Sequence, residues 1–398
     1  MVCAFGVAMI AGSLPAASHA QQPAGGDART PQAAARFEAT PRPPEDMSRL
    51  LTDAELAASR DSLWALEDPA YSTWVRTNAH PIRSLGASDF SDLRFLAPLL
   101  KDKRIVQLGE SSHGVAEFNL AKVRLVRFLH AELGYDVIAF ESSFADCDRT
   151  QRRSAALSAE ELMRGCLSGV WRTAEVLPLL EYVKATQRTD RPLAIAGFDI
   201  QFFRAESRFA RDDDDPAVAR QLVRSTAAWQ LMWVDPRGPG ATRDSAMAEN
   251  LEFLLVERYP GRKVIVWAHN SHIRHSRGAY ADSTPRQPRQ MGSWVAKRRR
   301  AELYTVGLYM YRGSAAAIDR TPYPIRQSRP GSLESILHQA PWRYAFVDFS
   351  AAQRERRSEW IWSPLDALEL GRYPDRVVPR NAYDAILFIE TTHPPEYR

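Results

Sequence analysis

One stretch of the chain, residues 104–141, has the sequence RIVQLGESSHGVAEFNLAKVRLVRFLHAELGYDVIAFE. It starts with a short apolar run, 105–108, which stops at a glycine and is followed at once by Glu110, two serines and His113. An amphipathic helical pattern comes next, and a second apolar run, 137–140, ends on another glutamate. The pattern predicts a strand, a turn, a helix and a second strand. Ligands bind at the carboxyl ends of strands in parallel sheets, so we expect this unit to hold half of a hydrolytic site.

Further short apolar runs, rich in Val, Ile, Phe and Tyr, follow along the chain. We predict strands at residues 193–196, 264–267, 303–309, 344–347 and 385–389. Helical patterns at 174–186, 242–258 and 292–299 separate them. Runs that are apolar throughout are typical of strands covered by helices on both faces. The sequence therefore predicts an α/β fold with a central, mostly parallel or mixed sheet flanked by helices.

The composition is that of a globular chain of 398 residues, with 45% hydrophobic and 25% charged residues. Those fractions allow a large buried core. The net charge of +4 is small for this length, and we see no stripe of basic and aromatic residues suited to nucleic acid. Residues 204–240 hold an acidic run and an amphipathic helical pattern, which predict a mainly helical insertion within a hydrolase domain spanning 47–398.

The N-terminal residues 1–20 contain an apolar run of signal-peptide length, too short to span a bilayer. The leader carries no Lys or Arg, but a small-x-small cleavage pattern ends at Ala20. An Ala/Pro/Gln-rich linker follows at residues 21–46. We therefore expect an exported, periplasmic protein that is cut after Ala20 and has no membrane association afterwards.

Three cysteines are present, and cleavage of the leader would remove Cys3. The remaining pair, Cys147 and Cys166, would meet an oxidising compartment, where a disulfide closing a short loop is favoured. Two buried thiols are an equally good interpretation, so the sequence leaves the state of this pair open.

Four polar residues lie just past predicted strands: Glu110, Glu141, Asp199 and His269. Each of them alone is explained by a helix cap or a loop salt bridge. Because the carboxyl ends of parallel strands share one edge of a sheet, the four together predict a common pocket at that edge.

Glu110 and His113 are three residues apart across a tight turn. A carboxylate holds an imidazole in one tautomer and raises its basicity, which allows the imidazole to deprotonate a water molecule. Neither Ser111 nor Ser112 lies in a G-x-S-x-G nucleophile elbow. The pattern therefore favours an activated water over a seryl intermediate.

A second pair of histidines, His269 and His272, has i, i+3 spacing, which puts both on one face of a helical turn. They could donate hydrogen bonds to a developing oxyanion, or bind a divalent metal together with Glu110 and His113. The spacing does not choose between these roles. We expect no cofactor, and the metal remains the alternative.

Further polar residues are expected to contact the substrate. Lys122 and Arg124 lie off the apolar stripe of the helix that follows His113, and either reach the pocket or face water. Arg243 and Asn250 share one face of a later helix. The expected substrate contacts are Lys122, Arg124, Asp199, Arg243 and Asn250.

At these residues the sequence resembles the erythromycin esterase family. The matching pieces, in order, are Gly109-Glu110-Ser111-Ser112-His113-Gly114, Glu117-Phe118, Phe140-Glu141, Gly197-Phe198-Asp199, Arg243-Asp244 with Met247, Glu249 and Asn250, Trp267-Ala268-His269-Asn270-Ser271-His272, Met291-Gly292, Gly331-Ser332-Leu333-Glu334 and Tyr383-Asp384-Ala385. The resemblance covers roughly residues 82–394.

The resemblance implies a central sheet flanked by helices, with a helical insertion over an active-site cleft. It implies hydrolysis of a carboxylic ester or macrolide lactone by a histidine-activated water, and with it macrolide resistance. His113 then corresponds to the general base and Glu110 to its partner, while Glu141, His269 and His272 complete the catalytic set. Lys122 stands where some members have Arg, which keeps the charge and loses bidentate geometry.

Two other interpretations remain open at this point. One is a metal-dependent hydrolase that uses the same Glu and His residues on another substrate. The other is an exported binding protein with a vestigial site, although a binder has no need of a base.

Overall fold

Strand β2 (Ile105–Leu108) lies in the middle of the sheet and is buried along its whole length. The structure is a computed structural model that describes residues 68–202, 205–276 and 290–398, all within one compact unit, Glu55–Arg398. The expected signal peptide, the linker and the first part of the predicted hydrolase domain lie outside the described residues.

The strands of the sheet run in the order β1-β8-β11-β6-β2-β5-β3-β4, with β7 paired to β6. Their bounds are β1 (Ala79–Pro81), β2 (Ile105–Leu108), β3 (Val137–Ser143), β4 (Ala194–Asp199), β5 (Val264–Trp267), β6 (Leu303–Ala316), β7 (Pro322–Pro324), β8 (Tyr344–Asp348) and β11 (Ala385–Thr392). The six strands from β11 to β4 are parallel, and β1, β7 and β8 pair antiparallel. The prediction of a mixed α/β sheet is confirmed.

A separate hairpin, β9 (Leu365–Glu369) and β10 (Tyr373–Val377), was not predicted. Strands β1 and β7 were missed as well, because all of these segments are short or polar and have no continuous apolar run. The hairpin matters for the site, because its turn reaches the cavity described below.

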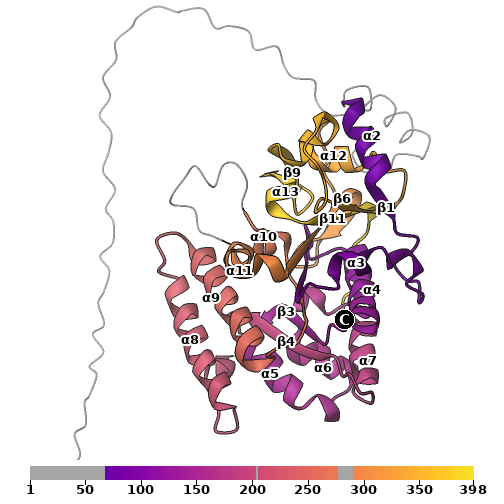
Figure 1. The fold of residues 1–398 in the computed structure, drawn as a ribbon. Helices are drawn as coiled ribbons and strands as arrows, with labels where there is room; N and C mark the ends of the chain where they lie inside the picture. The colour runs from indigo at the N-terminus through magenta and orange to yellow at the C-terminus, as the bar shows by residue number, and fades with distance from the viewer. Residues whose placement is uncertain (1–67, 203–204, 277–289) are drawn as a thin grey trace, which may run out of the picture. The chain divides into compact units, whose positions relative to one another are not determined.

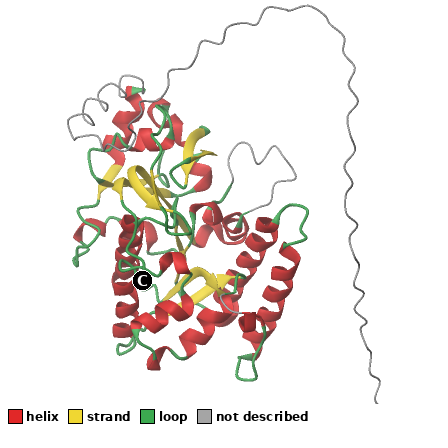
Figure 2. Cartoon of the chain, turned by 180° about the vertical axis from the view of Figure 1, so that it is seen from behind, coloured by secondary structure: helices red, strands yellow, loops and turns green. Residues whose placement is uncertain are grey.

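Helices cover both faces of the sheet, as Figures 1 and 2 show. Their bounds are α2 (Pro69–Asn78), α3 (Leu96–Leu100), α4 (Ala116–Leu133), α5 (Phe144–Arg152), α6 (Ala159–Cys166), α7 (Leu177–Thr186), α8 (Pro216–Met232), α9 (Pro239–Phe253), α10 (Asn270–Ile273), α11 (Met291–Arg299), α12 (Leu333–Leu337) and α13 (Pro379–Ala382). In the part of the chain that the structure describes, no helix is both long and apolar enough to cross a bilayer.

The core is divided by the sheet into two layers. Val264 and Val266 of β5 pack into one cluster with side chains of α9 and α11. Ile265 and Trp267 of the same strand pack into the other, with side chains of α4 and α7. Side chains alternate between the faces of a strand, so a run that is apolar throughout fills both layers.

The predicted helical insertion is present as α8, which packs against α9 in an antiparallel hairpin (Figure 1). The acidic run lies before α8, where Asp214 pairs with Arg149 and Arg152 of α5. Asp215 caps α8 by accepting hydrogen bonds from backbone N–H groups in its first turn. The acidic run is therefore part of the packing of this hairpin against α5.

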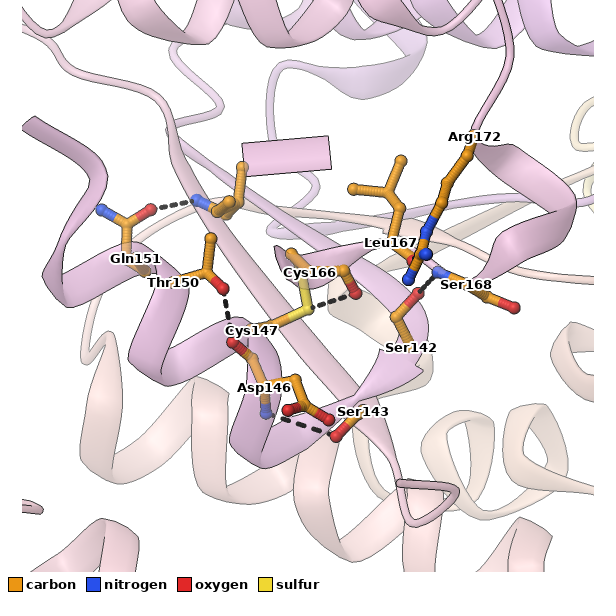
Figure 3. The surroundings of a disulfide bond; sticks show 11 residues. Ser142, Ser143, Asp146, Cys147, Thr150, Gln151, Cys166, Leu167, Ser168 and Arg172 are labelled. Atoms are coloured by element: carbon orange, nitrogen blue, oxygen red, sulfur yellow. Dashed lines mark hydrogen bonds between the residues drawn. A yellow bond between two sulfur atoms is a disulfide. The ribbon is translucent and has the colours of Figure 1, made fainter. Parts of the chain in front are cut away.

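Cys147 of α5 and Cys166 at the end of α6 form a disulfide (Figure 3). Just beyond it, the backbone N–H of Ser168 donates to Oγ of Ser142 in β3 at 2.9 Å. The disulfide and this hydrogen bond hold the segment that leads to Trp171 against the end of β3. The sequence left two interpretations open, a disulfide and two buried thiols, and the structure has the disulfide.

Candidate active site

A cavity of about 760 Å³ opens where the parallel strands end. Residues at or just past the ends of β2, β3, β4 and β5 line its floor, including His113, Glu141, Asp199 and His269. Three further segments form its walls: residues 168–171, residues 316–319 at the end of β6, and residues 369–372 at the turn between β9 and β10. Of the four residues predicted to share a pocket, Glu141, Asp199 and His269 line the cavity. The fourth, Glu110, is buried behind His113.

Gly109, the first residue after β2, allows the second histidine segment to approach. A Cβ added there would lie only 2.0 Å from Oδ1 of Asn270. Asn270 uses its amide to bind both the N–H and the C=O of Leu308 in β6. The close approach therefore fixes α10, and with it His269 and His272, beside the end of β2.

Glu110 is completely buried and binds three side chains. Its Oε1 accepts hydrogen bonds from Nδ1 of His113 at 2.7 Å and from Nε1 of Trp171 at 2.8 Å. Its Oε2 lies 2.5 Å from Nζ of Lys122. Because the carboxylate only accepts, Nδ1 of His113 carries the proton and Nε2 is left with a lone pair. The partly exposed ring of His113 lines the cavity, so Nε2 is the basic nitrogen there.

Lys122 supports this pair from below the cavity without lining it. Its side chain is fully buried, with Nζ 4.5 Å from the centre of the Trp267 ring. Burial lowers the pKa of Lys122 to about 8, although Glu110 and then Glu141 oppose this. The amine is therefore a counter-ion to Glu110 and does not contact the substrate.

Arg243 joins two strand-end carboxylates. Its Nε and Nη2 bind the two oxygens of Asp199 at 3.0 and 2.7 Å, and Nη2 also donates to Oε1 of Glu141 at 2.7 Å. Burial opposes the charge, but Asp199 and Glu141 together raise the pKa of Arg243 further above its ordinary value. Glu141 lies in β3 where pairing with β4 becomes irregular, which turns its side chain toward α10.

His272 lies between two carboxylates. Its Nδ1 is 2.8 Å from Oδ1 of Asp244, and its Nε2 is 3.2 Å from Oε1 of Glu141. Burial lowers the pKa of His272, but Glu141 and then Asp244 outweigh it and raise the pKa to about 10. We therefore assign an imidazolium, which has no lone pair to accept the hydrogen of Arg243 Nη1, 3.3 Å away. Arg243 and His272 can both be charged side by side because three carboxylates surround them, those of Asp199, Glu141 and Asp244.

Glu141 contacts Arg243, His272 and the backbone of His269. Although burial raises its pKa, His272 and Arg243 hold the pKa of Glu141 well below its usual range. Its other oxygen, Oε2, accepts the backbone N–H of His269 at 2.9 Å. Glu141 thus positions both histidines of α10.

His269 is buried and neutral. Burial, then the neighbouring His113, His272 and Arg274, hold its pKa well below 6.5, against the opposing effect of Glu141. Its Nδ1 accepts the backbone N–H of Ser271 at 3.2 Å, so the ring proton is on Nε2. That Nε2 is buried and has no hydrogen-bond partner among the residues that the structure describes. With its ring centroid 4.9 Å from that of His113, His269 offers a free N–H donor beside the base.

Two predicted substrate contacts do not reach the cavity. Arg124 donates to the carbonyls of Ser84, Ala87 and Asp89 and pairs with Asp92, so it holds the loop before α3. Asn250 is buried and bonds to Gln221, Ser225 and the Phe198 carbonyl, which ties α8 to β4. Both predictions are wrong in placement, because each side chain is held by other parts of the protein and does not line the cavity. Lys122, as described above, is the third residue with no cavity contact.

The expectation that the helical insertion covers the site also needs correction. Among the described residues of 204–240, none lines the cavity. The walls come from 168–171, from 316–319 and from the β9–β10 turn. This turn brings Glu369 beside His269 and Arg372 over the ring of Tyr323. The sequence carries no signal for Glu369, because β9 has neither an apolar run nor a strand-end motif.

The metal alternative would use Glu110, His113, His269 and His272 as ligands. Within residues 68–202, 205–276 and 290–398, no group of three or more His, Cys, Asp or Glu has a suitable arrangement. The reason is visible in the contacts: Glu110 and His272 already use their polar atoms on side-chain partners. Only Nε2 of His113 and Nε2 of His269 are free, fewer than the three protein ligands of a catalytic zinc.

Comparison with known proteins identifies the family. The family model described as erythromycin esterase matches residues 130–235 and 204–392, which together make up more than half of the chain. The chain belongs to the erythromycin esterase family. It is 28% identical over 414 residues to the "Putative hydrolase YbfO" of Bacillus subtilis (strain 168), covering 83% of this chain and 93% of that protein. Family membership and this relative together support hydrolase activity.

The chain is also similar to other members of the erythromycin esterase family and to solved structures. Erythromycin esterase type II of Escherichia coli is 35% identical over 77 residues, 19% of this chain and 18% of that protein. A crystal structure of a Bacillus cereus protein matches with a TM-score of 0.70 at 18% identity, covering 83% of this chain and 99% of that one. A mutant of erythromycin esterase EreC in its open conformation matches with a TM-score of 0.58 at 16% identity, covering 80% and 98%. These structural matches show the shared fold.

Proposed function

We propose that this protein hydrolyses a carboxylic ester or lactone with a water molecule that His113 activates. The observation that supports this most is the pairing of two histidines in opposite roles. His113 presents a basic Nε2 because Glu110 binds its Nδ1. His269, with its ring centroid 4.9 Å away, presents an unpaired Nε2–H.

The chemistry follows from these two atoms. Nε2 of His113 takes a proton from water, and the hydroxide attacks the ester carbonyl carbon. Nε2–H of His269 donates to the oxyanion that develops, in a buried setting where such a hydrogen bond is strong. Collapse of the tetrahedral intermediate breaks the bond to the alcohol oxygen. Glu110, Lys122 and Glu141 act by holding the two rings, and no covalent enzyme intermediate is needed.

The mechanism is tested with His113→Ala, which should lower kcat by about 10²–10⁴-fold. A matched control is His393→Ala, because His393 also binds a glutamate, Glu117, through Nδ1 at 2.7 Å but lies outside the cavity and is largely exposed. The control should keep normal turnover. Normal turnover by His113→Ala would overturn the mechanism.

The substrate class is tested by mass spectrometry. Macrolides and simple esters are incubated with the protein, and products that have gained one water are detected. Ring-opened macrolide would support a role in macrolide resistance, and turnover of simple esters alone would place the substrate elsewhere. Tight binding with no turnover of any ester would favour a vestigial binding protein. Metal analysis of the same sample tests the expectation that no cofactor is needed.

We also propose that the protein is exported. The Cys147–Cys166 disulfide supports this, because such bonds persist in oxidising compartments. The periplasmic fraction of expressing cells should contain the chain with Gln21 as its first residue. A cytoplasmic chain that retains its first residues would contradict the proposal.

A further inference from the structure

Nδ1 of His269 is crowded by three polar atoms. Ser271 approaches with its backbone N–H at 3.2 Å and its Oγ at 2.8 Å. Oε1 of Glu369, from the β9–β10 hairpin, lies 3.3 Å from the same nitrogen. Because the Ser271 N–H donates, Nδ1 is an acceptor. A carboxylate oxygen facing this lone pair would be repelled, so the favourable contact requires a proton on Glu369.

The other side of Glu369 shows why its charge is poorly compensated. Its Oε2 lies 3.3 Å from Nη2 of Arg274, but that nitrogen makes a shorter contact of 2.6 Å with Asp375. Burial raises the pKa of Glu369 to about 7, with Arg274 opposing and Asp375 reinforcing the shift. The charged or titratable groups facing Glu369 are Arg274, Asp375, His272, His113, His269, Tyr323 and Tyr383.

We propose that Glu369 and His269 share one proton and deliver it, through Nε2 of His269, to the departing alcohol oxygen. This inference rests on the proposed ester hydrolysis. Glu369 then supplies the proton that the leaving group needs, although it lies on the β9–β10 hairpin and not at the end of a parallel strand. Glu369 acts through His269 and is therefore a positioning and proton-supplying residue.

The protons balance over one turnover. His113 takes one proton from water, and hydroxide adds to the carbonyl. The oxyanion that Nε2–H of His269 has stabilised re-forms the carbonyl, and the C–O bond breaks. Nε2 then gives its proton to the alcohol oxygen of the same carbon, and Nδ1 takes the proton of Glu369. The carboxylate left on Glu369 faces Arg274. The proton on His113 then returns through water in the cavity to Nε2 of His269, and Nδ1 gives its proton back to Glu369. The acid product leaves, and both groups are again in their starting states.

The first test compares two esters of the same acid: an alkyl ester, whose alcohol must be protonated to leave, and a nitrophenyl ester, whose leaving group departs as an anion. Glu369→Gln keeps a hydrogen-bond donor for Nδ1 but cannot release a proton. Its kcat should fall about 10²-fold or more for the alkyl ester and by no more than about threefold for the aryl ester. An equal loss on both esters would overturn the proposal, because a structural role affects both alike.

The matched control is Asp366→Asn, which removes an exposed carboxylate from the same strand, β9. It should leave both rates unchanged. The ratio of the alkyl to the aryl kcat gives a second readout, because ionisations common to both substrates cancel. In the wild type this ratio should fall as the pH rises through about 7, where Glu369 loses its proton, and in Glu369→Gln it should be flat. A flat ratio in the wild type would also overturn the proposal.

A measurement without substrate separates this inference from the proposed function. In NMR spectra of labelled histidine nitrogens, Nδ1 of His269 should change its shift with a midpoint near pH 7 in the wild type but not in Glu369→Gln. The same pH dependence in both proteins would show that no proton is shared. If the wild type hydrolyses neither ester, the proposed function fails, and this spectrum still decides whether the pair exists.

Discussion

The guanidinium of Arg243 binds both oxygens of Asp199, at 3.0 and 2.7 Å, and reaches Glu141 with the same Nη2 at 2.7 Å. One side chain of α9 therefore joins the ends of β3 and β4. The planar fork of Arg matches this geometry, whereas Lys is a point charge. The position of the cavity floor depends on this contact.

Arg243→Ala should lower the free energy of unfolding by on the order of 3–5 kcal/mol, because it leaves two buried carboxylates without their cation. Arg243→Lys should recover only part of the loss. The measurement is urea unfolding followed by circular dichroism. The control is Arg237→Ala, which removes an exposed partner of Asp235 and should change stability little. Equal effects of the Arg243 and Arg237 variants would contradict this account.

Because of His272, the free energy of unfolding should decrease at alkaline pH. Glu141 and Asp244 raise its pKa to about 10 in the folded protein, against about 6.5 in the unfolded chain. A raised folded-state pKa contributes stability that is fully present below pH 6.5 and is lost as the pH rises through about 10. The urea midpoint should decline across this window, and the decline should be shallower in His272→Gln. An unchanged slope in the variant would assign the decline to other groups.

Lys122 should affect turnover without affecting substrate binding. Lys122→Met removes the cation at Oε2 of Glu110, so kcat should fall by about tenfold or more while KM changes little, because Lys122 does not line the cavity. In the wild type, the aryl-ester rate should fall as the pH rises through about 8, where Lys122 loses its proton. A large rise in KM with unchanged kcat would show that Lys122 contacts the substrate after all.

The disulfide should contribute to stability and to the position of Trp171. Replacing Cys147 and Cys166 together by Ser should cost on the order of 3 kcal/mol, given a sequence separation of 19 residues. Reductant should shift the urea midpoint of the wild type toward that of the variant and leave the variant unchanged. Because Trp171 donates to Glu110, turnover should fall as well. A wild type that is insensitive to reductant would contradict the prediction.

Much of the fold is readable in the sequence because each central strand is apolar on both faces. The parallel strands β2 to β6 and β11 were predicted with starts within one residue of those observed, and β8 was predicted as well. Strands β3, β4, β6 and β11 extend three or more residues beyond their predicted ends. The strand-end acids and histidines follow from the same pattern, because the end of a parallel strand determines the edge at which its next side chain lies. Nothing comparable predicts a short polar hairpin, so β9, β10 and Glu369 were missed.

Within α4, Lys122 and Arg124 are two residues apart and look alike in the sequence. The structure separates them: Lys122 is buried beneath Glu110, and Arg124 binds the loop before α3. Two residues along an α-helix differ by about 200° in direction, so Lys122 and Arg124 meet different neighbours, and those neighbours come from distant parts of the chain.

The sequence by itself determined the long apolar strands, their polar ends and the candidate for the base, since these depend on residues close together along the chain. Only the tertiary structure decided the protonation states: His272 charged between two carboxylates, and His269 neutral in a buried pocket. The proton of an imidazole depends on burial and on charges within a few ångströms. The charges around His272 come from Glu141 and Asp244, which are brought together only when the sheet and α9 pack around one cavity.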